Sequence, residues 1–312
     1  MIVCCGEALV DMVPARCEGG SGYLTKPGGS PYNVAVGLGR LEIPVGFLGS
    51  ISVDFFGDLL VRHLRENGVD LRYVVRAPSP TALAFVHLAA GKEPVFQFYG
   101  TGTADVMLAL DDLPVTFPPE VVGLHFGSIS LLRPPASEVY EHLMRREHRK
   151  RVISLDPNVR PAFIPDRAAF RVRLEDWICR VDLVRASRAD VAWVYPGEPI
   201  EEVARRWVAA GAGLVVVTLG EEGAFGCTVA STVRLPAHPV QVVDTVGAGD
   251  AFTAALLAWL VRTGWFDRIG KIPEGALAEA LHYAVRAAAV TCTRQGADPP
   301  YRWELEHPGR PS

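Results

Sequence analysis

The chain has 312 residues, of which 49% are hydrophobic and 21% are charged, and its formal net charge is −4. This composition is typical of a globular protein with a sizeable core and excludes a wholly disordered chain. The slightly acidic balance does not favour nucleic acid as a partner, because such binding rests on a basic surface.

The sequence predicts neither a membrane segment nor exposure to an oxidising compartment. The longest apolar stretch, 251–261, is much shorter than the roughly 20 residues that a membrane span needs. The N-terminus enters a strand-like run without the basic region of an export signal. The six cysteines lack metal-ligand spacing, and Cys4 and Cys5 would point to opposite faces of a strand. We therefore expect a cytoplasmic protein with reduced thiols and no membrane partner.

Short β-rich apolar runs alternate with helical patterns along most of the chain. This alternation predicts a single α/β domain over 1–312, a three-layer sandwich whose mostly parallel central sheet is covered by helices on both faces. The helix at 55–67 has the clearest limits, because Asp54 suits an N-cap and Gly68 suits the position after the last turn. Strands are predicted at 2–5, 45–50, 121–126, 152–156, 181–185 and 214–219, with helices at 31–41, 55–67, 135–147, 167–179 and 199–210.

Two segments break the alternation. Residues 13–27 are glycine-rich, and we predict an irregular structure for them. Residues 73–100 contain two strand-like runs, 82–89 and 94–99, joined by a predicted turn at 90–93. A hairpin cannot easily join a parallel sheet, so a small separate β layer is expected. This layer could be a lid over a site, or an edge extension that contacts a second copy of the chain, and both interpretations remain open.

The most informative segment is VVDTVGAGDAF at 242–252. We expect a short strand, a glycine-rich turn and then a helix. Gly247, Ala248 and Gly249 would present backbone N–H groups at the N-terminus of this helix, where an anion is favoured. Asp250 beside them is suited to accept a proton from a hydroxyl that attacks a phosphate. The alternative is an ordinary capping aspartate preceded by two turn glycines.

A second glycine-rich turn precedes the predicted helix at 31–41. Gly28 and Gly29 would allow a ligand to approach the backbone, and Asn33 offers both a donor and an acceptor. Asp11, expected just after the first strand, adds a carboxylate near the sheet edge at which open α/β folds bind ligands. Taken separately, each of these residues is also typical of a turn.

Other nucleotide signatures are absent from the sequence. The glycines at 37–39 lie in a helical pattern and lack the third glycine of a dinucleotide fingerprint, and no P-loop is present. These absences disfavour a dinucleotide-dependent oxidoreductase, which is one rival interpretation.

Together, these segments resemble the ribokinase-like (PfkB) family of carbohydrate kinases. The resemblance rests on GGSPYNVA at 28–35 and DTVGAGDAF at 244–252, with DPNVR at 156–160 and TLGEEG at 218–223 between them. It implies a ribokinase-like fold with a small β lid and transfer of the γ-phosphoryl group of ATP to a sugar hydroxyl. It also implies Mg²⁺ on the phosphates and a homodimer formed through the lid.

The resemblance also assigns roles to residues. Asp250 would be the catalytic base, with Gly247, Ala248 and Gly249 as the anion hole. The sugar would contact Asp11, Gly28, Gly29, Asn33, Arg160 and Asp250. The nucleotide would contact Ser187, Thr218, Gly220, Gly223, Gly247 and Gly249.

Two ion sites are implied as well. The family's Asn/Ser-x-x-Glu motif is matched here only by Ser187–Asp190, so that Asp190, one methylene shorter, would reach Mg²⁺ through a water. A monovalent cation such as K⁺ would lie against Asp244, Val246, Arg294 and Gly296, mostly at backbone carbonyls.

The substrate is less closely defined. GEALVD at 6–11, TALAFV at 81–86 and FGSISL at 126–131 look most like fructokinases, while relatives that act on 2-keto-3-deoxygluconate, aminoimidazole riboside or ribose share much of this pattern. Gly100 stands where many fructokinases and ketodeoxygluconate kinases carry arginine, which favours a neutral sugar, although Arg160 could still supply charge. A sugar-binding regulatory protein on the same scaffold is the non-kinase alternative; it would be expected to lack Asp250 or a glycine of the anion hole.

Overall fold

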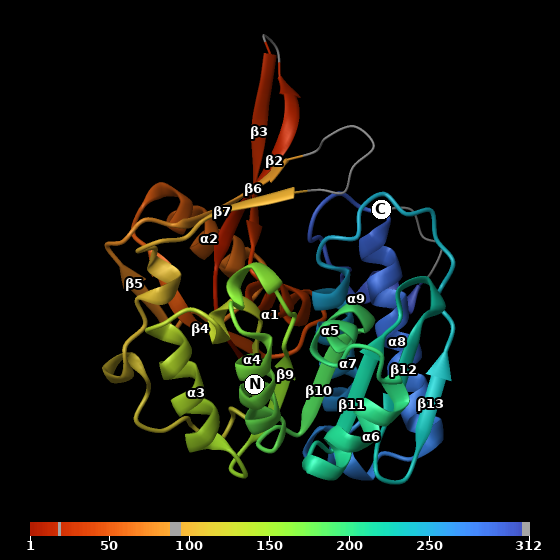
Figure 1. Ribbon diagram of the computed structural model, residues 1–312. Coiled ribbons are helices and arrows are strands. Elements are labelled where there is room, and N and C mark those ends of the chain that lie inside the picture. The colour runs from red at the N-terminus through yellow and green to blue at the C-terminus, as the bar shows by residue number, and fades with distance from the viewer. Residues whose placement is uncertain (18–19, 88–94, 308–312) are drawn as a thin grey trace.

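The computed structural model describes residues 1–17, 20–87 and 95–307. Within them, nine strands form a large sheet in the order β13-β12-β11-β10-β9-β8-β1-β4-β5 (Figure 1). Every pairing is parallel except those of β12, which is antiparallel to both neighbours. The strands are β1 (Ile2–Cys5), β4 (Val45–Ser52), β5 (Val74–Ala77), β8 (Gly123–Gly127), β9 (Val152–Asp156), β10 (Leu183–Ser187), β11 (Leu214–Thr218), β12 (Ala224–Cys227) and β13 (Thr232–Leu235).

Helices cover both faces of this sheet. Successive residues of β1 alternate between two cores, because side chains of a strand point to opposite faces: Val3 and Cys5 belong to one core, Ile2 and Cys4 to the other. Helices α3 to α6 pack on the first core, and α1, α2, α7 and α8 on the second. The three-layer prediction is therefore confirmed. The helices are α1 (Ser30–Arg40), α2 (Phe55–Glu66), α3 (Ala136–Glu147), α4 (Arg167–Ile178), α5 (Arg188–Val194), α6 (Ile200–Ala210), α7 (Ala248–Arg262), α8 (Glu274–Cys292) and α9 (Arg302–Glu306).

Helix α2 begins and ends where its sequence predicts. Asp54 caps its N-terminus, with Oδ1 accepting a hydrogen bond from the Gly57 N–H at 2.7 Å. Gly68, at φ +74°, follows the last turn in the left-handed conformation that glycine adopts without strain. Asp54 also ties the helix to the start of β6, because its carboxylate accepts hydrogen bonds from the Thr81 N–H at 2.8 Å and the Thr81 hydroxyl at 2.7 Å.

Asp54→Ala is expected to lower the free energy of unfolding by about 2 kcal/mol, because it removes the cap together with both bonds to Thr81. Asp54→Asn keeps the acceptor at the cap and loses only the bond to the Thr81 N–H, so its loss should be smaller. Urea unfolding of both variants measures the difference. An Asp54→Ala variant as stable as Asp54→Asn would contradict this role.

A second sheet of four strands lies outside the main layers. Within the described residues its order is β3-β2-β6-β7, and it projects from the top of the molecule in Figure 1. The strands predicted at 82–89 and 94–99 are confirmed at 82–87 by β6 and at 95–99 by β7, while their remaining residues and the turn at 90–93 fall outside the described residues. The strands of this sheet are β2 (Leu9–Cys17), β3 (Gly20–Gly28), β6 (Ala82–His87) and β7 (Val95–Tyr99).

Two local predictions are wrong. Residues 13–27 belong to the β2–β3 hairpin, whose register runs from Leu9 opposite Gly28 to Cys17 opposite Gly20. Pairing between the two strands outweighs the low strand propensity of Pro14 and of the glycines in β3, and β2 is also anchored at its start, where Leu9–Met12 pair in parallel with β6. The segment near 242, expected to be a strand, is irregular instead: it pairs with none of the strands in the described ranges, and the N–H groups of residues 243 and 244 donate to the Cys292 carbonyl at the end of α8.

None of the helices in the described part of the chain has the length and apolar character needed to cross a membrane.

Candidate active site

The site forms where the N-termini of α1 and α7 meet. Asp250 is the third residue of α7, and its side chain is buried. Its Oδ1 accepts a hydrogen bond from the Ser30 hydroxyl at 2.7 Å, and its Oδ2 accepts one from Asn33 Nδ2 at 2.8 Å. Both partners lie in the first turn of α1. The structure thus brings Asn33 and Asp250, which are 217 residues apart in sequence, into direct contact.

Two carboxyl groups in this site have raised pKa values. Burial raises the pKa of Asp250 to about 6, and the hydrogen bonds from Asn33 and Ser30 oppose the rise. The pKa of Asp11 is also raised to about 6, first by burial and then by the negative charge of Asp250. The two groups therefore lie close enough to interact electrostatically. Asp11 follows the first strand in the chain, as expected, and lies inside β2.

The glycines before α1 make room for this arrangement. A Cβ on Gly28 would lie 2.4 Å from Asp11 Oδ2, closer than any side chain could tolerate. Gly29 has φ +109°, and a Cβ there would lie 2.5 Å from the Glu7 carbonyl oxygen. Gly29 therefore has to be glycine, and a side chain at Gly28 would displace the Asp11 carboxylate from its present position.

The predicted anion hole lies at the start of α7. Gly247 is the N-cap residue, with φ +76°, and a Cβ there would meet Ala297 at 2.5 Å. The Ala248 N–H donates to the Thr245 carbonyl at 3.2 Å, whereas the N–H groups of Gly247 and Gly249 have no backbone partner among the described residues. The first turn of α7 therefore keeps donors for an anion, and the helix dipole adds to their effect.

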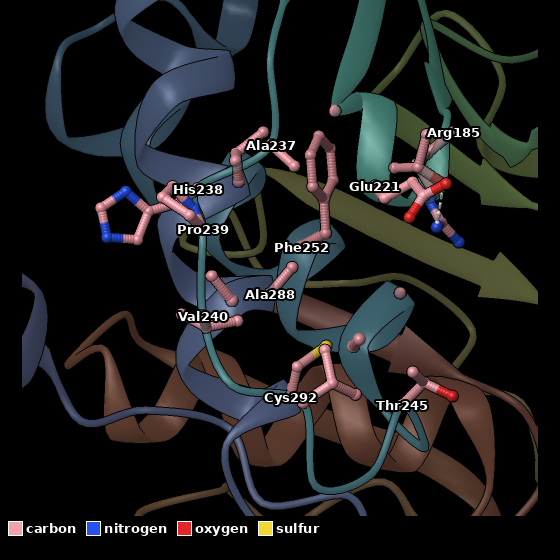
Figure 2. Close-up of a pocket in the computed structure, with 18 residues that line it drawn as sticks. Arg185, Glu221, Ala237, His238, Pro239, Val240, Thr245, Phe252, Ala288 and Cys292 are labelled. Atoms are coloured by element: carbon pink, nitrogen blue, oxygen red, sulfur yellow. Dashed lines mark hydrogen bonds between the residues drawn. The ribbon is translucent and has the colours of Figure 1, made fainter.

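A cavity of about 640 Å³ opens beside this turn (Figure 2). Four of the residues predicted to contact a nucleotide line it: Thr218, Gly220, Gly223 and Gly249. Ser187 and Gly247 are not among its lining residues. Residues 237–240 form one wall, with Arg185 and Glu221 across from them in Figure 2. The size and the mostly apolar walls suit the base and ribose of a nucleotide.

Asp190, the predicted magnesium contact, is largely committed to local hydrogen bonds. Its Oδ2 accepts from the N–H and the hydroxyl of Ser187, at 2.7 and 2.6 Å, in a capping box at the start of α5. Its Oδ1 accepts from the Val159 N–H at 2.7 Å. Three of the four acceptor positions of the carboxylate are therefore taken. The remaining acceptor position can accept a hydrogen bond from one water bound to a metal. It does not suit a carboxylate that coordinates Mg²⁺ directly and replaces several of its waters.

The loops predicted to hold a monovalent cation lie together. Asp244 joins them, because its Oδ1 accepts from the Val246 N–H at 3.0 Å and its Oδ2 from the Gly296 N–H at 2.8 Å. The Arg294 side chain turns away and pairs with Asp298 and Glu304, so only its backbone is available to a cation.

Of the predicted sugar contacts, Arg160 has the weakest connection to the site. Its side chain is exposed, and its Nη1 donates to Asn158 Oδ1 at 2.6 Å.

Comparison with known sequences decides the family. A family model described as "pfkB family carbohydrate kinase" matches residues 1–304. The chain belongs to this family. The resemblance inferred from the glycine-rich segments is therefore confirmed, and the protein is a sugar kinase of the PfkB type.

Individual relatives of this PfkB kinase agree with that assignment. A fructokinase of Rhizobium leguminosarum bv. trifolii is 42% identical over 83% of this chain and 79% of its own length. The crystal structure of a fructokinase from Xylella fastidiosa with bound ATP has a TM-score of 0.84 and 29% identity, with coverage of 95% and 93%. A double-mutant fructokinase from Vibrio cholerae O395, in a fructose-, ADP- and potassium-bound form, has a TM-score of 0.80 and 27% identity, with coverage of 95% and 93%.

The sequence did not single out several residues of the PfkB site. Glu7 is the clearest, since its two carboxylate oxygens accept hydrogen bonds from the N–H groups of Ser30 and Ser130, each at 3.1 Å. Burial raises the pKa of Glu7 to about 7 despite these bonds. Its only signal in the sequence is one acidic residue within the apolar run at 2–10.

The apolar wall of the nucleotide cavity was also missed. One face of α8 supplies Val285, Ala288, Ala289 and Cys292, which follow the helical spacing of three and four residues. Such a stripe is typical of any packed helix, so the sequence alone could not distinguish a cavity wall from core.

Proposed function

We propose that this carbohydrate kinase transfers the γ-phosphoryl group of ATP to a hydroxyl of fructose, with Asp250 as the base. One observation carries the proposal: a buried carboxylate with a raised pKa, held by Ser30 and Asn33 beside N–H groups at the start of α7 that have no backbone partner in the described part of the chain. The fructokinase relatives, among them one that is 42% identical, support fructose as the acceptor.

The chemistry follows from this placement. The sugar lies against Asp11 and the Gly28–Gly29 loop, and the triphosphate points from the cavity toward the first turn of α7. The acceptor hydroxyl attacks the γ-phosphorus while its proton moves to Asp250. An oxygen–phosphorus bond forms, and the bond to the β-phosphate oxygen breaks, with ADP keeping the electron pair. The N–H groups of Gly247 and Gly249 stabilise the charge on the transferred group.

Charge near the lid supports a neutral sugar. At the end of β7, where the sequence has Gly100 in place of arginine, the Arg133 guanidinium donates to the Gly100 carbonyl. This cation is already paired with the buried Asp105 and lies over the Phe98 ring, 4.9 Å from its centroid. It is therefore not free to neutralise a substrate carboxylate, and an unpaired carboxylate in this place would be costly.

Two ions complete the proposal. Mg²⁺, when bound to the phosphates, would neutralise part of their charge; Asp190 would contact it through one water. K⁺ would lie between the loops joined by Asp244, as the potassium-bound form of the Vibrio cholerae relative suggests.

An ADP-release assay with Mg²⁺ and ATP tests the acceptor. The panel contains fructose, 2-keto-3-deoxygluconate, aminoimidazole riboside and ribose, each with and without K⁺. We expect preferred turnover of fructose, increased by K⁺. Preferred turnover of another acceptor would overturn the substrate assignment and leave the kinase chemistry in place. Binding of sugars without turnover of any of them would favour a regulatory protein.

The acid limb of the pH–rate profile is a further expected result. A base acts only when ionised, so kcat/KM should be constant above about pH 7 and fall below about pH 6, where Asp250 becomes protonated. Asp11 has a similarly raised pKa, so both carboxyl groups titrate in this pH range. The slope of log(kcat/KM) against pH on the acid side should therefore lie between one and two. Initial rates from pH 4.5 to 8.5 measure it, with the coupling enzymes in excess. A rate that rises on acidification would contradict a carboxylate base.

Three broader predictions still stand as proposals. We place the chain in the cytoplasm as a single domain, and we expect a homodimer formed through the four-stranded sheet. Tyr23, Leu24 and Tyr99 support the dimer, because these large side chains on the sheet are each about half exposed. Sedimentation velocity measures the oligomeric state.

A further inference from the structure

Arg185 is a buried cation in the middle of β10. Its Nη1 donates to Asp156 Oδ2 at 2.7 Å, and its Nη2 donates to the Thr218 hydroxyl at 2.6 Å. Its Nε has no partner in the described part of the chain. A guanidinium carries five N–H donors, and two hydrogen bonds to described residues account for only part of them. Arg185 therefore has capacity for an additional anion.

The guanidinium lies directly against the first turn of α7. A Cβ on Gly249 would be 2.7 Å from Arg185 Nη1 and 3.2 Å from its Cζ. Glycine at this position therefore lets the cation approach the backbone of the predicted anion hole. Arg185, Thr218 and Gly249 also line the same cavity, and Figure 2 shows Arg185 on the wall across from His238.

The charges around Arg185 are mostly negative. Asp156 at the end of β9, Asp190 in α5 and Asp250 in α7 all act electrostatically on it and favour its charged form, against the cost of burial. Among the described residues that line the cavity, Arg185 is the only one with a permanent positive charge. A triphosphate bound at this wall would add several negative charges. A fixed cation here offsets the electrostatic repulsion between those charges and the nearby carboxylates.

We propose that Arg185 is a catalytic residue of this kinase, whose guanidinium binds the β- and γ-phosphates of ATP beside Gly249 and stabilises the charge that moves onto ADP. The proposal rests on the placement of ATP in this cavity and not on the identity of the sugar. When the bond between the γ-phosphorus and the bridging oxygen breaks, the electron pair remains on ADP. A preorganised cation next to that oxygen stabilises the transition state more than the ground state.

The experiment replaces Arg185 with methionine or lysine. Asp156 would be left as an unpaired buried charge in Arg185→Met, which could prevent folding, so the double variant Arg185→Met/Asp156→Asn is made as well. The matched control is Arg206→Met, which removes an exposed arginine of α6 that pairs with Glu198. Each variant is assayed for kcat and KM for ATP with the sugar that the wild type prefers, and calorimetry gives the Kd values of ATP and AMP.

We expect Arg185→Met, or the double variant if the single one does not fold, to lower kcat on the order of 10²–10³-fold and to weaken binding of ATP but not of AMP. Arg185→Lys should recover part of kcat as a point charge, and Arg206→Met should match the wild type. The acid limb should move to higher pH in Arg185→Met, because Arg185 lowers the pKa of Asp250. Arg185 is also faced by Asp156, Asp190 and Thr218. The acid limb of Arg185→Met is therefore compared with the acid limb of the double variant, in which Asp156 is neutral.

Two results would overturn the proposal. A folded Arg185→Met or double variant with kcat within threefold of the wild type would show that no phosphate depends on this cation. Equal losses of ATP and AMP binding would show that Arg185 only maintains the shape of the pocket. If the wild type does not phosphorylate fructose, the proposed substrate fails, while the comparison of ATP with AMP still tests Arg185.

Discussion

Asp250→Asn is expected to lower kcat on the order of 10²–10⁴-fold, the range that a positioned general base supplies, while the KM for the sugar changes little. The substitution preserves the local structure. The amide oxygen accepts the hydrogen bond from Asn33, and the amide nitrogen donates to the Ser30 hydroxyl, which accepts as readily as it donates. What is lost is the lone pair that takes the proton of the acceptor hydroxyl.

The same variant should be more stable than the wild type. In the folded chain the pKa of Asp250 is about 6, against an ordinary value of 3.8, so ionisation of this group opposes folding. The loss of folding free energy that ionisation causes begins above about pH 4, grows up to about pH 6 and is constant at higher pH. A difference of this size corresponds to at most ~3 kcal/mol at pH 7.5. A neutral asparagine avoids this cost, so thermal unfolding should shift upward by several degrees.

Opposite changes in activity and stability make this test specific. Asp267→Asn, an exposed substitution beyond the other end of α7, is the matched control and should change neither quantity. A large loss of kcat together with a lower Tm would indicate misfolding instead of a missing base. Near-wild-type turnover by Asp250→Asn would remove Asp250 from the mechanism.

The main layers of the fold could be predicted because local signals and tertiary structure agree there. The buried strands β8 to β11 are short and mostly apolar in sequence, and α2 carries its own cap and its own buried stripe at Leu60 and Leu64. The β2–β3 hairpin could not be predicted in this way. Its two strands pair with each other along their whole length, and the base of β2 at Leu9–Met12 is anchored on β6, a strand more than 60 residues further along the chain, which no local pattern reports.

The site residues likewise divide into those that local sequence patterns reveal and those that only the folded structure reveals. Asp250, Asn33 and the glycines were recognised because they stand in short motifs. Arg185 and Glu7 were not, because each lies alone within an apolar strand or run, where a charge has meaning only through its partners. Arg185 acquires that meaning from the 2.7 Å approach to the Gly249 position, and Glu7 from its bonds to the N–H groups of Ser30 at the start of α1 and Ser130 in a short 3-10 helix, 100 residues apart. Contacts of this kind depend on the assembled fold.

Asp11→Asn is expected to raise the KM for the sugar about 10- to 100-fold and to change kcat by only a few fold. A hydrogen bond to a charged acceptor contributes roughly 1.5–3 kcal/mol, which corresponds to this range of affinity. Asp11 is well placed for such bonds, because it lies in β2 opposite Ala84 of the small sheet and against the Gly28 backbone. The Kd of ATP, which we propose to bind on the other side of Asp250, should not change.

The pH dependence adds an independent measurement to the Asp11→Asn variant. The charge of Asp11 and that of Asp250 repel each other, and this repulsion contributes to the raised pKa of Asp11. Because the interaction is mutual, removing the charge at Asp11 should lower the pKa of Asp250. The acid limb of kcat/KM should then move to lower pH and fall with a smaller slope, since the Asp11 carboxylate no longer titrates.

The control for this prediction is Asp58→Asn, which removes an exposed carboxylate of α2 that pairs with Arg76. It should leave the KM for the sugar and the acid limb unchanged. If Asp11→Asn raised the KM for ATP as much as that for the sugar, the effect would be a general disturbance of the site. If the KM for the sugar stayed at the wild-type value, the acceptor would have to bind away from β2, and the lid that the family resemblance implies for the four-stranded sheet would be contradicted.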